Sequence, residues 1–140
     1  MSRIRSKDTQ PELKVRSALH RRGYRFVLHD SRLPGKPDIV LARYGVAIQV
    51  RGCFWHGHTC SDGHLPKSRA TYWRPKLAAN KARDVRNDRH LRALGWKVAV
   101  VWECRAAKAA SLDAEVGRIL KLLKARTARS LKLARLRRRH

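Results

Sequence analysis

The sequence predicts an α/β fold in which a small mixed β-sheet is sandwiched by helices. Three stretches carry apolar residues at helical spacing, and short apolar runs bounded by Gly, Pro or charged residues alternate with them. The resulting order is helix, three strands, long loop, helix, strand and helix, which neither an all-β protein nor a helical bundle has. Helices are expected over residues 10–22, 71–94 and 112–124, and strands over 24–28, 38–41, 46–50 and 96–102.

The first helix has clear start and stop residues. Thr9 and Glu12 have the spacing of a capping box, and Pro11 is tolerated in a first helical turn. Gly23 is typical of the position just after a last turn. The expected core face comprises Val15, Ala18, Leu19 and Arg22.

Short apolar runs define the expected sheet. A Pro-Gly turn separates the first run from the second, which begins at Asp38. Residues 46–50 are apolar almost throughout and are expected to form a buried central strand. Residues 96–102 give the clearest strand pattern, and we assign Trp96 and Trp102 to the core.

The C-terminal half adds a long loop and two helices. Residues 52–70 show neither a helix nor a strand period. The helix that follows carries two acids, Asp84 and Asp88, on an otherwise basic sequence. Ser111 is a candidate N-cap for the last helix.

The chain is strongly basic. It holds 34 Lys and Arg against 10 Asp and Glu, a formal charge of +24, and a polyanion such as nucleic acid would relieve the self-repulsion. A membrane surface is the weaker alternative, because the sequence has no long apolar run, signal peptide or lipidation motif. We expect one domain over residues 1–124 and a basic C-terminal tail over 125–140.

Cysteines and histidines gather in the long loop. Cys53, His58 and Cys60 have the spacing C-x4-H-x-C, and Cys104 ends the clearest strand. Together they make a Cys3His set, typical of a structural zinc that would hold the loop to the sheet edge. The alternative is three buried reduced thiols beside a solvated histidine. The rival fourth ligands are His56 and His64.

An acid opens the second expected strand. Asp38 either pairs with one of the many cations or binds a hard metal such as Mg²⁺ through oxygen. Pro37-Asp38, followed after a short interval by Gln49-Val50-Arg51, resembles the P-D…(D/E)-x-K signature of a broad nuclease superfamily. The second position is Gln here, and the third is Arg, which stays protonated and cannot act as a base.

Longer motifs resemble one family, the very short patch repair (Vsr) DNA mismatch endonucleases. The most specific are GCFWH, which begins at Gly52, and WEC, which ends at Cys104. The resemblance extends over about residues 2–105 and leaves the last 35 residues uncovered. Its matching segments are residues 2–13, 33–40, 52–60, 72–73, 80–88 and 94–104.

The resemblance implies an activity and its cofactors. It implies a phosphodiester hydrolase that nicks one DNA strand on the 5′ side of the T in a T:G mismatch, with catalytic Mg²⁺ and structural zinc. It also implies a restriction-endonuclease-like αβββαβ core. We therefore expect double-stranded DNA as the partner, a monomer, a cytoplasmic, nucleoid-associated location in a prokaryote, and mismatch-repair proteins as further candidate partners.

The resemblance also implies roles for single residues. Asp38 resembles the Mg²⁺ carboxylate, with the Val50 carbonyl as a second ligand, and His56 resembles the catalytic histidine supported by Asp84. Glu12 resembles a further active-site acid from the first helix. The zinc set matches the Cys3His group above. The residues expected to contact DNA are Phe54, Trp55 and Trp73, as rings that wedge into the mismatched stack, together with Lys36 and Arg51.

This chain departs from the family pattern at one point. A Thr-His pair in the family is replaced here by Val50-Arg51, so a second active-site histidine is missing. Arg51 can hold a phosphate or stabilise charge but cannot transfer a proton.

Two alternatives therefore stay open: an endonuclease of the same fold with another site or structure specificity, and a non-catalytic zinc-containing nucleic-acid-binding protein. Asp38, His56 and Asp84 argue against the second of these.

Overall fold

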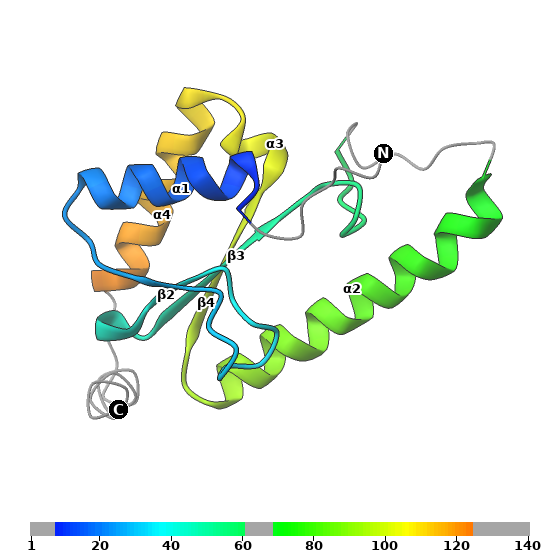
Figure 1. Cartoon of the computed structure of the whole chain (residues 1–140), viewed down its shortest axis with the longest axis horizontal. Coiled ribbons are helices and arrows are strands. Elements are labelled where there is room, and N and C mark those ends of the chain that lie inside the picture. Colours follow the sequence, from blue (N-terminus) through cyan, green and yellow to red (C-terminus); the bar gives the residue numbers. More distant parts are fainter. Residues whose placement is uncertain (1–7, 61–68, 125–140) are drawn as a thin grey trace.

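A computed structural model describes residues 8–60 and 69–124, which form a mixed α/β structure (Figure 1). The order of the main elements is the one that the sequence predicts, with two extra short helices, one after β2 and one after β4. The elements are α1 (Gln10–Arg21), β1 (Val27–Leu28), β2 (Ile39–Leu41), the 3-10 helix η1 (Ala42–Tyr44), β3 (Val46–Arg51), α2 (Ala70–Ala93), β4 (Lys97–Trp102), α3 (Glu103–Ala106) and α4 (Ala109–Lys124).

The sheet is mixed, and its four described strands lie in the order β1-β2-β3-β4. β1, β2 and β3 are antiparallel neighbours, whereas β3 and β4 are parallel. Arg51 at the end of β3 is therefore opposite Trp102 at the end of β4, and β2 begins near the same edge. Three chain segments meet at this edge. Side chains at the strand ends are not enclosed in the sheet there and are available to form a site.

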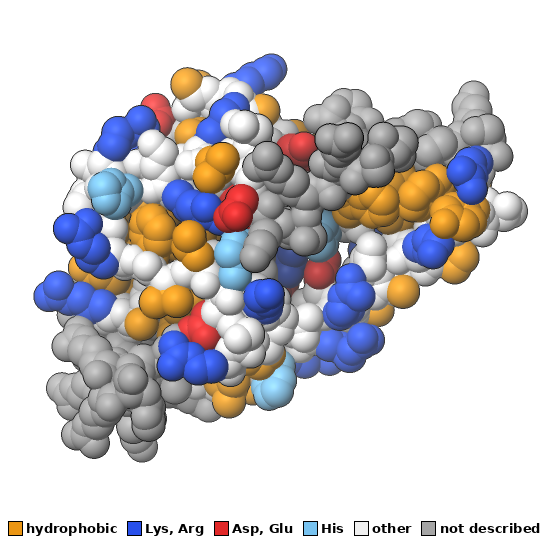
Figure 2. Space-filling model, viewed as in Figure 1, with side chains coloured by type: hydrophobic (Ala, Val, Ile, Leu, Met, Phe, Trp, Pro, Cys, Tyr) orange, Lys and Arg blue, Asp and Glu red, His pale blue; other side chains and the backbone are white. Residues whose placement is uncertain are grey.

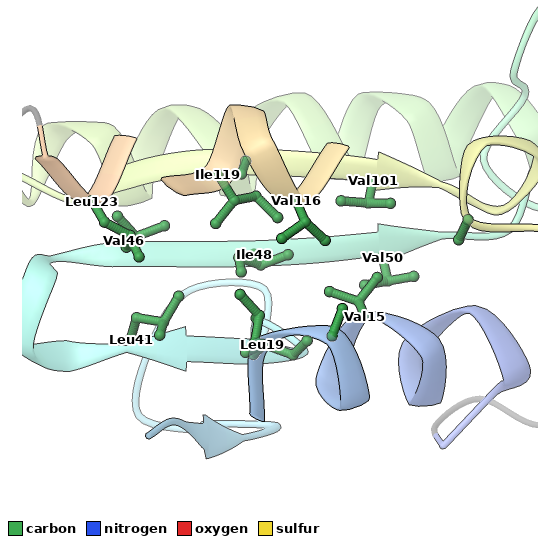
Figure 3. Close-up of a cluster of buried hydrophobic side chains, with 14 residues drawn as sticks. Val15, Leu19, Leu41, Val46, Ile48, Val50, Val101, Val116, Ile119 and Leu123 are labelled. Atoms are coloured by element: carbon green, nitrogen blue, oxygen red, sulfur yellow. The ribbon is translucent and has the colours of Figure 1, made fainter. Parts of the chain in front are cut away.

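Helices cover both faces of the sheet (Figure 1). α1, α3 and α4 pack on one face, where Val15, Leu19 and Ile119 meet Ile48 of β3 (Figure 3). α2 lies on the other face, where Leu91 joins a smaller cluster comprising Val40, Ala47 and Trp96. Every residue of β3 is buried, as expected of a central strand covered on both sides.

Two expectations for the first helix are confirmed. The capping box is present, with the Thr9 side chain accepting from the Glu12 N–H, and Gly23 has a φ of 85° just after α1. Leu77 and Leu91 lie on the buried face of α2 with Asp88. Within the described ranges, no helix is long and apolar enough to span a membrane.

Other local expectations are wrong. The first strand covers only Val27–Leu28, because these residues alone pair with β2. Ser111 lies inside α4 and not at its N-cap, since its hydroxyl donates to the carbonyls of Arg105 and Lys108 and the helix begins at Ala109. Arg22, expected on the core face of the first helix, is exposed.

Trp102 is not a core residue either. It is half-buried and its ring stacks on His58, with centroids 4.1 Å apart. Trp96 is buried as expected. The tail predicted over 125–140 lies outside the described residues.

Candidate active site

The strand ends open onto a cleft of about 990 Å³. α1, the start of β2, the end of β3, the loop after it and α2 all contribute to its walls. The cleft brings together Glu12, Asp38, His56, Trp73 and Asp84, which are far apart in the sequence.

Asp38 immediately precedes β2, and its side chain is 17% exposed. One carboxylate oxygen accepts a hydrogen bond of 2.7 Å from the Val50 N–H, because β2 and β3 are antiparallel neighbours here. The other oxygen lies 3.7 Å from Nδ1 of His29. Burial raises the pKa of Asp38 to about 6, and the negative charge of Glu12 adds to this effect. A cation in the cleft would favour the ionised form, so the site suits a hard metal ion.

Glu12 belongs to a second group of charges beside Asp38. It is buried, and Arg16 donates to its carboxylate at 3.2 Å and to Asp8 at 2.6 Å. The hydrogen bond from Arg16 is the largest cause of the lowered pKa of Asp8. Nε2 of His29 lies 3.4 Å from Glu12, so His29 connects Glu12 to Asp38. Ligand atoms of Asp8, Glu12 and His29 lie within 4.8 Å of one another and could hold a metal ion, but Arg16 already supplies them with a positive charge.

His56 and Asp84 form a hydrogen-bonded pair. Nδ1 of His56 lies 2.6 Å from a carboxylate oxygen of Asp84. The Asp84 carboxylate accepts a hydrogen bond from the Nδ1–H of the ring. The other ring nitrogen, Nε2, is then available to exchange a proton with a group in the cleft. A histidine oriented by an acid, near a carboxylate that can hold a cation, is suited to hydrolysis of a phosphate ester.

Three aromatic rings line the cleft beside this pair. The ring centroids of Phe54 and Trp55, of Phe54 and Trp73, and of Trp55 and Trp73 lie 5.1, 5.1 and 5.4 Å apart. All three side chains are only partly buried. Asn80 of α2 donates to the Trp55 carbonyl at 2.9 Å and so ties the loop to the helix. Hydrophobic side chains gather along the N-terminal half of α2 in the space-filling view (Figure 2).

The predicted Cys3His set is assembled. Ligand atoms of Cys53, His58, Cys60 and Cys104 lie within 4.8 Å of one another and could hold a metal ion. Cys104 Sγ is 3.7 Å from Nδ1 of His58. Burial raises the pKa of the Cys53 thiol to about 12, so a thiolate there requires a neighbouring cation. Of the two rival ligands, His56 bonds to Asp84 instead, and His64 lies outside the described residues.

The remaining predicted residues line the cleft, with different surroundings. Lys36 is exposed and has a φ of 46°. It follows Gly35, where an added Cβ would lie 2.8 Å from Cβ of Asn87, so this turn approaches α2 closely. The Val50 backbone borders the cleft, and its role as a metal ligand stays a prediction. Arg51 is buried and donates to Asp88.

Sequence reasoning assigned no role to His29, Arg16, Asn80 or the pairing of Asp88. The sequence offered one indication for Asp88, which is a second acid on a basic helix. It offered none for His29, since this residue follows a two-residue strand and its position depends on a φ of 47°.

Comparison with known proteins places these residues in a family. Residues 1–62 match the family model described as DNA mismatch endonuclease Vsr. The type II nicking enzyme V.XorIIP of Xanthomonas oryzae pv. oryzae is 53% identical over 86% of this chain and 88% of its own. The type II nicking enzyme V.NmeAIP of Neisseria meningitidis is 42% identical over 89% of each. The DNA mismatch endonuclease Vsr of Escherichia coli is 40% identical over 74% of this chain and 67% of its own. With identities of this size over most of both chains, the protein belongs to the Vsr family of DNA endonucleases.

Proposed function

We propose that this protein is a Mg²⁺-dependent endonuclease that nicks one DNA strand on the 5′ side of the T at a T:G mismatch. The observation that carries the proposal is the shared cleft of Asp38, the His56–Asp84 pair and the three rings. Asp38 can hold a cation, the His56–Asp84 pair can transfer a proton, and the three rings can contact unstacked bases.

Asp38 is proposed to hold Mg²⁺, with the Val50 carbonyl as a further ligand and Glu12 as a nearby acid. Carboxylate and carbonyl oxygens are the ligands that Mg²⁺ prefers, and because burial raises the pKa of Asp38, a bound cation would stabilise its ionised form. Bound there, Mg²⁺ would supply charge stabilisation for the phosphate that reacts.

His56 is proposed to transfer the proton near the scissile phosphate. Asp84 orients its ring through the hydrogen bond at Nδ1. Lys36, at the exposed rim of the cleft, is proposed to contact a DNA phosphate.

The Cys3His set is proposed to hold zinc. Zn–S and Zn–N bonds of about 2.3 and 2.0–2.1 Å at a tetrahedral angle separate S and N by about 3.6 Å. The separation of 3.7 Å between Cys104 and His58 agrees with this value. Such a site would fix the loop that carries Phe54, Trp55 and His56.

The rings of Phe54, Trp55 and Trp73 are proposed to insert beside the mismatched pair. A mismatch is a poorly stacked step, so a ring enters there at lower cost than in matched duplex. Their edge-to-face packing and partial exposure leave aromatic surface facing the cleft.

The wider context is also proposed. Charge of +24 favours duplex DNA as the partner of a monomer in the cytoplasm, associated with the nucleoid, and mismatch-repair proteins are candidate partners. The observed element order supports a restriction-endonuclease-like core.

A second candidate is a nicking enzyme of the same family with another sequence specificity. Two of the three relatives described above carry the name type II nicking enzyme, which supports it.

A nicking assay on labelled duplexes separates these candidates. One duplex has a single T:G mismatch and its partner is fully paired, each tested with and without Mg²⁺. We expect nicking of the mismatched duplex in Mg²⁺ only. Equal cleavage of both duplexes would favour the second candidate, and cleavage of neither would refute the first.

A further inference from the structure

Arg51 is tied to α2 by a buried ion pair. It ends β3, whereas Asp88 lies on the inner face of α2, 37 residues later, and each residue is 8% exposed. One terminal nitrogen of Arg51 donates to both carboxylate oxygens of Asp88, at 2.7 and 2.8 Å. The guanidinium is therefore engaged before any substrate arrives.

The same guanidinium lies close to the His56–Asp84 pair. Nε of Arg51 is 3.8 Å from Oδ2 of Asp84, and this same oxygen is 2.6 Å from Nδ1 of His56. Arg51 and His56 thus both lie near one carboxylate oxygen of Asp84. Asp88 follows Asp84 by one turn of α2, so Asp88 can bind Arg51 while Asp84 binds His56.

We propose that the Arg51–Asp88 pair is a positioning device for His56, resting on the function proposed above. Asp88 holds the arginine, which fixes α2 against the end of β3 and leaves Asp84 to the histidine. Without Asp88, Arg51 would turn to Asp84, the nearest other carboxylate among the described residues, and compete with His56 for it. Arg51 in this arrangement contacts Asp88 and no phosphate.

The proposal differs measurably from a direct phosphate contact by Arg51. A lysine or arginine that neutralises a phosphate contributes about 0.9 to the slope of log binding constant against log salt concentration. An arginine already neutralised by Asp88 contributes nothing to that slope. A merely structural pair would not separate the rate of nicking from the affinity for DNA.

The first measurement is single-turnover nicking of the T:G duplex at saturating enzyme. Asp88→Asn is expected to lower the rate constant at least about tenfold, because Arg51 then takes Asp84, while the Kd stays within about twofold. Asp88→Glu keeps a carboxylate and is expected to restore most of the rate. Asp113→Asn, an exposed site on α4 with the same charge change, is the matched control and should nick like the wild type.

The second measurement is Mg²⁺-free DNA binding at several salt concentrations. Arg51→Met is expected to bind with the wild-type slope. If Asp88→Asn does not fold, the double variant Arg51→Met with Asp88→Leu removes both buried charges at once; it should bind with the wild-type slope and nick faster than Arg51→Met alone, which leaves Asp88 unpaired.

Three results would overturn the proposal: a slope that falls by about 0.9 in Arg51→Met, a wild-type rate in Asp88→Asn, or a double variant no faster than Arg51→Met. Inactivity of the wild type on both duplexes would instead refute the proposed function.

Discussion

Replacing Asp38 by Asn should stabilise the Mg²⁺-free protein while abolishing nicking. The carboxylate is buried beside Glu12, and its pKa is raised from 3.8 to about 6. Asparagine keeps an oxygen that can accept from the Val50 N–H but carries no charge to bury. The residue proposed to hold Mg²⁺ is therefore one whose ionised form lowers the stability of the fold.

The magnitude follows from the linkage between protonation and folding. A carboxyl group whose pKa is raised on folding contributes stability that is fully present below pH 3.8 and is lost as the pH rises through about 6. Across that interval the loss is about 3 kcal/mol. Asn does not titrate, so Asp38→Asn should gain about 3 kcal/mol over the wild type at pH 7.5 and about 1.5 kcal/mol at pH 5.

Urea unfolding at these two pH values measures the difference. The buffer should lack both Mg²⁺, which would stabilise the wild-type carboxylate, and chelators, which would strip a metal from the Cys3His set. Asp113→Asn is the control, because it removes an exposed carboxyl and changes the net charge equally. Its unfolding free energy should stay within about 0.5 kcal/mol of the wild type.

Two outcomes contradict this reasoning. A variant no more stable than the wild type at pH 7.5 would mean that the Asp38 carboxylate is not penalised by burial. An equal gain at both pH values would mean that the effect does not come from titration. Retained nicking would separately remove Asp38 from the metal site, whereas DNA binding should survive in either case.

Three further predictions concern other parts of the cleft. Asp84→Asn should slow nicking by about 10²–10⁴-fold with little change in Kd, because His56 loses the acid that orients it; a wild-type rate would exclude the pair from catalysis. Cys104→Ser should lose the single zinc that elemental analysis is expected to find in the wild type, and a well-folded wild type without metal would rule the site out. Trp73→Ala should reduce the preference for the mismatched over the paired duplex more than it reduces binding to the paired duplex, measured by competition; an unchanged preference would remove the ring from mismatch recognition.

The features that the sequence predicted well are those with local or chemically narrow signals. Helix ends such as the Thr9 cap depend on residues a few positions apart. The metal set could be found although Cys104 is distant, because thiolate and imidazole ligands occur together in few other settings. The strands expected over 38–41 and 46–50 could be predicted because each is a short apolar run bounded by turn or charged residues.

The features that it missed depend on how distant elements are stacked. Asp88 contacts Arg51 because α2, which connects the parallel strands β3 and β4, packs across the sheet with Asp88 next to the end of β3. His29 reaches both Glu12 and Asp38 only because its backbone is left-handed. Trp102 fits a core pattern by sequence, but the assembled Cys3His set provides a histidine for its ring to stack on.

Charge made Arg51 the hardest residue to interpret from sequence. In a chain with 34 basic and 10 acidic residues, a cation is expected to meet DNA, since most have no acid to pair with. The expectation does not hold for a cation that lies beside one of the few acids. Asp88 forms an ion pair with Arg51, and Glu12 and Asp8 form ion pairs with Arg16. If the role proposed for Arg51 holds, cations paired with a buried acid do not contact phosphates and instead fix the geometry of the cleft. The acids of a very basic DNA-binding enzyme accordingly indicate which of its cations serve the fold and the catalytic geometry, and the salt dependence of binding should count only the others.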